Sequence, residues 1–303
     1  MKTNAIVRIV VYSLVIIILL GILLAGIGVN VFSVNHMTSG DPDIEVQTLD
    51  MNGSVSANAV NNISIEWVAG SVTIKPEDTD KISFSESDVE DEKMKMVWKL
   101  DGSTLKIQYC KESIKFPSFG INFTGNLSKD LVITVPRDWV CDTLEIDCAS
   151  ATVNAQDLTI REVDFDGASG TCSFENCHVD ELDLDTASGD VVFSGTLNAL
   201  DCDAASANCD ITVSNVPQRF DIDTASGDLE LTLPDGCGFT CGLDTMSGRF
   251  SSDFETTTNN GHHVHGDGSC RINVSAMSGD VTIKKHSGIS AVITDGTHHD
   301  EHH

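Results

Sequence analysis

The chain has 303 residues and a formal net charge of −28, from 46 acidic and 18 basic side chains. All of the acidic residues lie after position 32, together with all but two of the basic ones. A field of this sign repels nucleic acid and anionic lipid, so we expect no nucleic-acid partner, and it favours cations and basic partners. The simplest interpretation of most of this charge is a solvated acidic exterior.

The N-terminal part predicts a membrane anchor. Residues 1–8 carry Lys2 and Arg8, and residues 9–32 are almost wholly apolar, which is long enough to cross a bilayer as a helix. The basic flank precedes this run, so residues 1–8 should lie in the cytoplasm and the rest of the chain outside. A cleaved signal peptide is the alternative, but its apolar core would be only about 7–15 residues long. We therefore predict an uncleaved, single-pass protein of the cell membrane with an extracellular C-terminal domain.

Two segments lead into the main domain. Residues 33–62 are rich in Asn, Ser and Gly and predict a stalk or lead-in, and residues 63–140 predict an irregular β cap region. In that region, segment 94–109 alternates on both sides of Asp101-Gly102, which is a strong hairpin signal. Segment 131–136 is a further expected strand, which ends in proline. We expect this region to cover the membrane-proximal end of the domain that follows.

Residues 141–285 repeat one unit of strand, corner and strand, and LDLDTASGDVVF at 182–193 is its clearest copy. Apolar and polar residues alternate on both sides of its corner, as in half-buried strands, and Ser and Gly suit the corner itself. Most copies follow one another after about 20 residues, and the last carries an inserted loop at 259–268. The glycine, or the small residue that replaces it, lies at Gly70, Ala151, Gly170, Gly189, Ala207, Gly227, Gly248 and Gly279.

The copies align in apolar columns. Residues seven and five positions before each corner residue, and two positions after it, are apolar in every copy. A unit this short cannot bury its apolar face alone, whereas stacked units form a continuous core. We therefore predict an all-β fold, a β-solenoid (β-helix) of coils of about 20 residues, with a His-rich tail at 286–303. The handedness of the coil and the number of strands per coil stay open.

Several segments resemble a known family. DLVITVPRD (130–138), DTASGD (185–190 and 223–228) and AMSGDV (276–281) are similar to the LiaG-like putative adhesin family, a bacterial envelope β-repeat domain of unknown function. The resemblance covers roughly residues 45–290. It implies a β-solenoid on the outer side of the membrane, often behind one anchor, and some members are linked to envelope-stress operons. It implies no catalytic residues.

The ten cysteines form no CxxC motif, and four of them fall in the apolar columns: Cys172, Cys202, Cys209 and Cys241. Cysteine packs there as a small hydrophobe. The two that share a column stand two coils apart, about 10 Å at about 4.8 Å per coil, which is beyond the reach of a disulfide. We therefore expect mainly free, buried thiols. Pairing stays open for Cys237 with Cys241 and for Cys110 with Cys141.

One column of aspartates could bind cations. If the coils stack in register, carboxylates lie about 5 Å apart at Asp147, Asp166, Asp185, Asp203, Asp223 and Asp244. Like charges at this spacing repel, and Ca²⁺, which takes several oxygen ligands, would relieve the repulsion. A second acidic column and the acidic residues after the corner glycines (Asp190, Asp228 and Asp280) could add ligands. The alternative is a solvated face that discourages aggregation, because neither an EF-hand nor a β-roll motif is present.

Two histidine clusters are candidates for Zn²⁺: His262, His263 and His265 in the inserted loop, and His298, His299, His302 and His303 in the tail. Neutral imidazole ligates Zn²⁺, Ni²⁺ and Cu²⁺. If the loop and the tail lie at the same end of the solenoid, they could share an ion. The alternative is two exposed polar segments.

No nucleophile elbow, zinc-protease motif, P-loop or dinucleotide fingerprint is present, and the acidic pairs recur in every coil instead of marking one site. We therefore expect a non-enzyme without a required cofactor, an interaction module that binds an envelope protein or polysaccharide. A metal-binding surface protein and, less favoured, an enzyme acting on wall polysaccharide are the alternatives.

Overall fold

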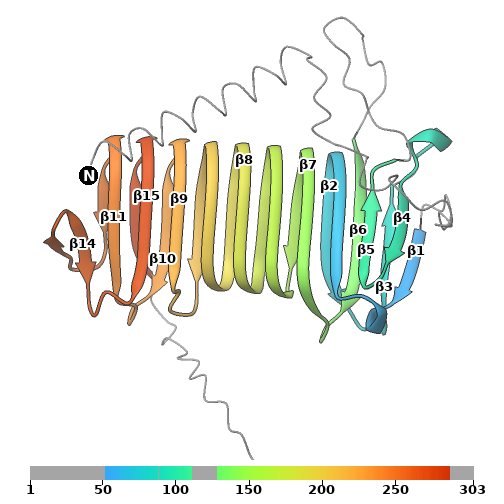
Figure 1. Cartoon of the computed structure of the whole chain (residues 1–303), viewed down its shortest axis with the longest axis horizontal. Helices are drawn as coiled ribbons and strands as arrows, with labels where there is room; N and C mark the ends of the chain where they lie inside the picture. The colour runs from blue at the N-terminus through green and yellow to red at the C-terminus, as the bar shows by residue number, and fades with distance from the viewer. Residues whose placement is uncertain (1–51, 88, 111–127, 287–303) are drawn as a thin grey trace, which may run out of the picture.

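A computed structural model describes residues 52–87, 89–110 and 128–286 (Figure 1). The predicted transmembrane helix at 9–32, most of the stalk, and the tail after His286 lie outside the described residues. In the described part, no helix is long and apolar enough to cross a bilayer. Its helical segments are two short turns, η1 (Ala57–Ala59) and η2 (Glu92–Met94).

The described part of the chain is all-β, as predicted for the domain, and its strands belong to one sheet of 16 strands. The first seven are β1 (Asn52–Ser56), β2 (Asn62–Glu77), β3 (Lys81–Glu86), β4 (Val97–Asp101), β5 (Thr104–Gln108), β6 (Lys129–Pro136) and β7 (Val140–Gln156). The next four are β8 (Thr159–Val213), β9 (Arg219–Ser226), β10 (Leu229–Pro234) and β11 (Phe239–Ser247). The last five are β12 (Phe250–Ser252), β13 (Thr257–Asn259), β14 (His262–His265), β15 (Cys270–Ser278) and β16 (Val281–His286).

The sheet winds into a flattened rod of stacked coils (Figure 1). In each coil, the segment before the corner lies on one long face, here called the first face, and the segment after it lies on the second face. Neighbouring coils pair in parallel, and each residue pairs with its equivalent in the next copy of the repeat, as predicted. Leu144 is the partner of Val163 before the corner, and Val153 is the partner of Cys172 after it. These residues point inward and are buried. The columns of the sequence therefore form one continuous core.

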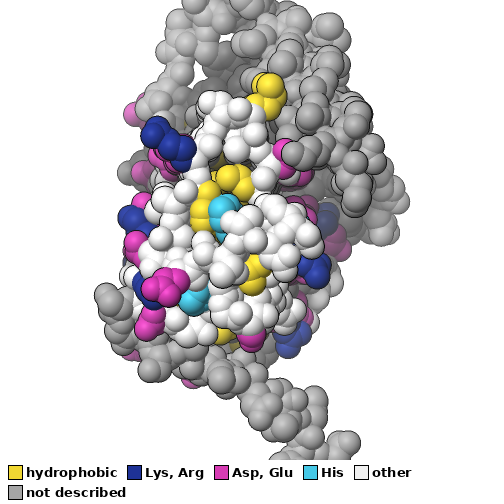
Figure 2. All heavy atoms as spheres, turned by 90° about the vertical axis from the view of Figure 1, so that its left-hand side faces the viewer, with side chains coloured by type: hydrophobic (Ala, Val, Ile, Leu, Met, Phe, Trp, Pro, Cys, Tyr) yellow, Lys and Arg dark blue, Asp and Glu magenta, His cyan; other side chains and the backbone are white. Residues whose placement is uncertain are grey.

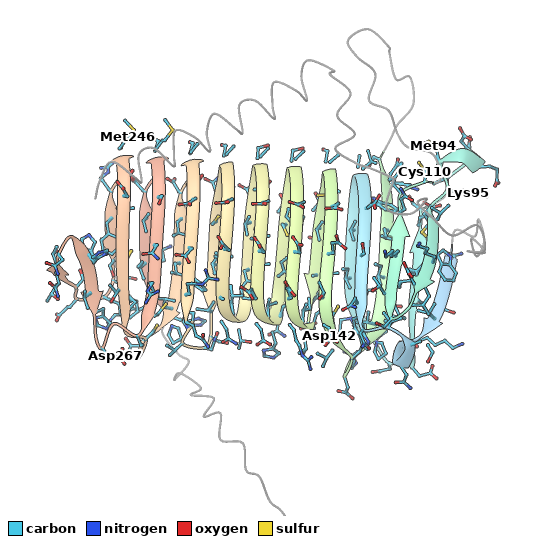
Figure 3. The ribbon with its side chains drawn as sticks, in the orientation of Figure 1. Met94, Lys95, Cys110, Asp142, Met246 and Asp267 are labelled. Carbon is cyan, nitrogen blue, oxygen red and sulfur yellow. The ribbon has the colours of Figure 1, made fainter. Side chains whose placement is uncertain are left out.

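The corners explain the repeated glycines. Gly170, Gly189 and Gly227 have φ between 128° and 143°, in the region that favours glycine. A Cβ on Gly189 would lie 1.8 Å from the carbonyl oxygen of Gly170 in the neighbouring coil. The corners form one edge of the rod, and Met246 lies at the end of this edge (Figure 3). Glycine thus permits both the turn and the close stacking of successive corners.

The C-terminal coils are not stacked in chain order. β15 pairs in parallel with β9 on one side and with β11 on the other, so the last coil lies between the two that precede it in sequence. On the second face, β16 likewise lies between β10 and β12. Stacking in sequence order, which the predicted column of six aspartates requires, therefore does not hold at this end. After β9, the chain continues into β11 without placing it next to β9, and β15 later occupies the position between the two strands.

The segment expected as an inserted loop is instead an end cap. β13 and β14 form an antiparallel hairpin, and β14 pairs with the outer edge of β11. Phe254 is buried under this cap, edge-on to Phe239 at 5.4 Å. Viewed from this end, hydrophobic and histidine side chains lie together near the middle, and charged side chains lie around them (Figure 2). The hairpin thus covers the apolar interior that the last coil would otherwise expose.

The N-terminal end is partly regular. β2 belongs to the stack, because Ile63 pairs in register with Leu144, so the coils begin earlier than residue 141. The expected hairpin and strand are confirmed as β4–β5 and β6. Together β5 and β6 form one further coil outside β2.

A buried ion pair closes this end. The Lys129 ammonium contacts the Glu86 carboxylate and donates to the carbonyl oxygens of Tyr109 and Met94, the latter at 2.8 Å. It also lies over the ring of Trp67, 4.7 Å from the centroid. Burial lowers the pKa of Lys129, and the contact with Glu86 opposes that shift. Sequence patterns gave no sign of this pair, because one lysine among many polar residues has no periodic signature.

Candidate functional site

Acidic side chains gather on the first face, between the buried residues that point inward. Two adjacent columns, here called the acidic face, consist of Glu145, Asp164, Asp183, Asp201 and Asp221, and of Asp147, Asp166, Asp185, Asp203 and Asp223. Register pairs join Asp147 to Asp166 and Asp203 to Asp223 in neighbouring coils. The carboxylates of one column therefore follow one another at the strand spacing of about 4.8 Å.

Several carboxyl groups of the acidic face have raised pKa values, because they are partly buried and lie close to one another. Burial, and then repulsion by Asp166, raise the pKa of Asp147 to about 7. Burial and repulsion from neighbouring coils likewise raise the pKa of Asp185 and of Asp203 to about 6. Asp166, Asp185 and Asp203 nevertheless remain exposed, so the carboxylates are desolvated only in part by the adjacent coils. The face carries charge that the folded protein does not neutralise well.

The predicted column of six aspartates is interrupted. Because β15 lies between β9 and β11, Ser275 stands between Asp223 and Asp244. In the neighbouring column, Asn273 takes the corresponding position and donates to the carboxylate of Asp221 at 2.6 Å. Asp244 is therefore not part of the continuous acidic face, and the prediction that it extends the column is wrong.

Arg219 neutralises one end of the acidic face. Its guanidinium lies 3.0 Å from Asp221, 3.8 Å from Asp201 and 3.5 Å from Glu181. For Asp147, Asp166, Asp185 and Asp203, no ion pair is found within the described ranges of the chain. The uncompensated part of the face thus lies over β7 and β8. Periodicity gave no sign of Arg219, which is one of only six basic residues between positions 141 and 285.

The acidic residues after the corner glycines have a structural role. Asp228 accepts a hydrogen bond at 2.8 Å from the backbone N–H of Asp280, and Asp280 accepts one at 2.9 Å from that of Arg249. Asp190 accepts from the side-chain amide of Asn208 at 3.1 Å. These carboxylates link successive coils, so their hydrogen-bonding capacity is already used in part within the stack.

The histidines of the hairpin do not converge. His263 stacks on Phe250, with ring centroids 3.9 Å apart, whereas His265 packs against Phe254 and bonds the carbonyl of Glu255 at 2.8 Å. His262 lies on the other side, next to Gly242. Among the described residues, no group of three or more His, Cys, Asp or Glu side chains is arranged to hold a metal. The tail histidines His298, His299, His302 and His303 lie outside the described residues, so their metal binding stays a prediction.

The cysteines are buried, as predicted. Cys141, Cys237 and Cys241 are free thiols, and neither of the pairings left open by the sequence is formed. Cys202 and Cys209 shift each other's pKa in opposite directions, and so do Cys237 and Cys270. The second pair was not foreseeable, because Cys270 lies beside Gly238 only through the return of β15 into the stack.

The cavities identified in the described part are small. One lies under the corners and is lined by Cys202, Cys209 and Leu229, and the other lies at the opposite corner between Ile63, Leu144 and Ile160. The acidic face is instead an open surface, suited to contact with a partner along the rod.

The chain matches the family described as Toastrack DUF4097 over residues 60–284. No match was found among curated proteins.

Among solved structures, a putative cell adhesion protein from Clostridium sporogenes is 12% identical to this chain, with a TM-score of 0.36. The match covers 78% of this chain and 98% of that chain. A putative adhesin from Bacteroides fragilis is 12% identical, with a TM-score of 0.39 and coverage of 78% and 96%. A putative lipid binding protein from Parabacteroides distasonis is 12% identical, with a TM-score of 0.31 and coverage of 78% and 97%. The family match extends over most of the chain, from β2 to β16, and the chain therefore belongs to the Toastrack DUF4097 family.

Proposed function

We propose that this protein is a non-catalytic interaction module of the bacterial cell envelope, held by the apolar segment 9–32 and presenting its acidic face outside the membrane. Its role would be adhesion, or scaffolding under envelope stress. The observation that carries the proposal is the run of uncompensated carboxylates over β7 and β8. A partner that supplies positive charge there relieves repulsion that the folded chain itself leaves in place.

The geometry favours a basic protein segment as the partner. The carboxylates lie in straight columns on a flat face, about 4.8 Å apart along the rod. Lysine and arginine side chains of an extended segment can reach such columns without a preformed pocket. A cationic polysaccharide is the competing partner, and the experiment below distinguishes the two.

The test compares two charge variants of the full chain. The face variant carries Asp147→Asn, Asp166→Asn, Asp185→Asn and Asp203→Asn. The control variant removes the same number of charges elsewhere, at exposed positions, through Glu90→Gln, Asp138→Asn, Asp210→Asn and Glu255→Gln. The probes are a labelled oligolysine peptide and a deacetylated glucosamine oligosaccharide, and their dissociation constants are measured at low and high salt.

We expect the peptide to bind the wild type in a salt-sensitive manner, and the face variant to bind at least about tenfold more weakly. The control variant should keep most of the affinity. Equal loss in both variants would show that net charge alone attracts the peptide. Preference for the oligosaccharide would reassign the partner class.

The anchor is tested separately on intact cells. If segment 9–32 spans the membrane with residues 1–8 inside, an external protease should digest the domain before lysis. Removal of residues 9–32 should abolish its retention in the membrane fraction. Protection of the domain until lysis would contradict the outward orientation.

A further inference from the structure

The strand at one end of the sheet has an open edge. β13 comes last in the strand order and pairs with β14 alone among the described strands. Its residues, Thr257–Asn259, are all exposed, and within the described ranges no other backbone hydrogen bond reaches them. One side of β13 therefore presents backbone N–H and C=O groups to solvent at the end of the rod (Figure 1). Such an edge is a template for another strand.

This edge lacks the features that usually keep strands from pairing with other molecules. Residues 256–266 contain no Asp, Glu, Lys, Arg or Pro, although the chain as a whole has a net charge of −28. Protected edges commonly carry charged side chains or proline, whereas the threonines of β13 favour extended strands. In the end view, the charged side chains lie around the margin and not over the middle (Figure 2).

The other open edges of the described sheet differ from β13. β4 carries an ion pair between Lys99 and Asp101, at 3.6 Å. On β12, the ring of Phe250 is covered by the stacked ring of His263. β1 lies at the opposite end of the strand order, directly after the N-terminal residues. β13 is therefore the uncharged edge that lies farthest along the sheet from the N-terminal segment.

We propose that two copies of this chain associate end to end, by antiparallel pairing of their β13 strands around a two-fold axis. Antiparallel pairing of identical strands is self-complementary, because each copy supplies the same groups to the other. With the axis at the central residue, Thr258 lies opposite Thr258 of the second copy, and paired threonines stabilise adjacent strands. Glu255 then lies opposite Gly261, so no like charges face each other across the axis.

The charge of the rod favours a contact between ends. Side-by-side packing through the first face would bring two acidic faces together, and their like charges repel. End-to-end pairing keeps these faces apart. A strand of three residues forms a small interface, so the association is weak and depends on concentration. This inference goes beyond the proposed binding role, and neither depends on the other, because the acidic face over β7 and β8 takes no part in the contact.

The experiment uses Thr258→Cys in the full chain, purified in detergent micelles and oxidised mildly. The ten native cysteines are buried, so the new thiol is the accessible one. Residues directly opposite in antiparallel strands have Cα atoms about 4.5–5.5 Å apart, which permits a disulfide. Ser54→Cys on β1 and Thr152→Cys on β7 are the controls, at exposed positions away from β13. We expect at least about tenfold more linked dimer for Thr258→Cys than for either control.

A charge variant tests the same contact without a covalent bond. Thr258→Lys places two ammonium groups opposite each other, and like charges so placed destabilise strand pairing. The mass of the wild type in micelles should rise towards that of a dimer with concentration, as should that of Thr152→Lys, whereas Thr258→Lys should stay monomeric. Equal linkage at Ser54 or Thr152 would show association through other surfaces and overturn the proposal. So would a Thr258→Cys chain that stays monomeric, and slow hydrogen exchange of β13 in that monomer would show that another segment of the same chain covers the edge.

Discussion

Replacing Asp147 by asparagine should stabilise the protein at neutral and alkaline pH. The carboxyl of Asp147 has a pKa of about 7 in the folded chain, raised by burial and then by Asp166, against an ordinary value near 4 in the unfolded chain. Between these values the folded state binds more protons than the unfolded state. The free energy of unfolding therefore falls as the pH rises from about 4 to 7, and the cost is present in full above that range.

The size of the effect follows from the same shift. At 1.36 kcal/mol per pH unit, a carboxyl raised from its ordinary value to about 7 would cost about 4 kcal/mol if nothing screened it. Asp147 is only partly buried, and solvent screening weakens such interactions strongly. We therefore expect Asp147→Asn to raise the free energy of unfolding by about 1–2 kcal/mol at pH about 8, and to have little effect at pH about 5.

The assay is denaturant unfolding of both chains at these two pH values. Asp221→Asn is the matched control on the same acidic face, because the Asp221 carboxylate pairs with Arg219 at 3.0 Å and accepts a hydrogen bond from Asn273. That substitution should destabilise the protein. The reasoning is wrong if Asp147→Asn destabilises at alkaline pH as Asp221→Asn does, or if the wild type becomes more stable from pH about 5 to pH about 8.

Three further predictions concern the rod itself. Gly189→Ala places a Cβ 1.8 Å from the Gly170 carbonyl oxygen at a φ of 139°, so it should lower the free energy of unfolding by about 2–4 kcal/mol in a denaturant titration; an unchanged midpoint would contradict the close stacking of corners. Lys129→Met leaves the buried Glu86 carboxylate without its cation and should cost about 3–5 kcal/mol, much of it recovered in the double variant with Glu86→Gln; a double variant no better than the single one would refute this account. Phe254→Ala removes the buried ring under the end cap and should cost about 3 kcal/mol, with faster hydrogen exchange in β13 and β14 but not in β7, because coils contact only their neighbours; uniform acceleration would count against this local response.

Much of the fold could be predicted because its information is local and periodic. The apolar residues around 144, 163 and 182 recur at a nearly fixed spacing, and any register that buries one of them buries the others. For the same reason, the acidic columns between them had to point outward together. The role of the small residues at the corners could also be predicted, because corners that stack on the corners of neighbouring coils leave no room for a larger side chain.

The tertiary structure decided what periodicity cannot encode. The repeats do not specify the order in which the coils stack. The apolar columns are buried equally well whether Asp223 lies next to Asp244 or next to Ser275. The choice depends on the connection after β10 and on the hairpin that caps β11, both of which act between residues distant in sequence. That choice ends the acidic face at Arg219 and Asn273, and pairs Cys270 in register with Phe239. The sequence alone thus determined the repeating coil and its charged surface, whereas long-range packing determined where that surface stops and which side chains meet across the inserted coil.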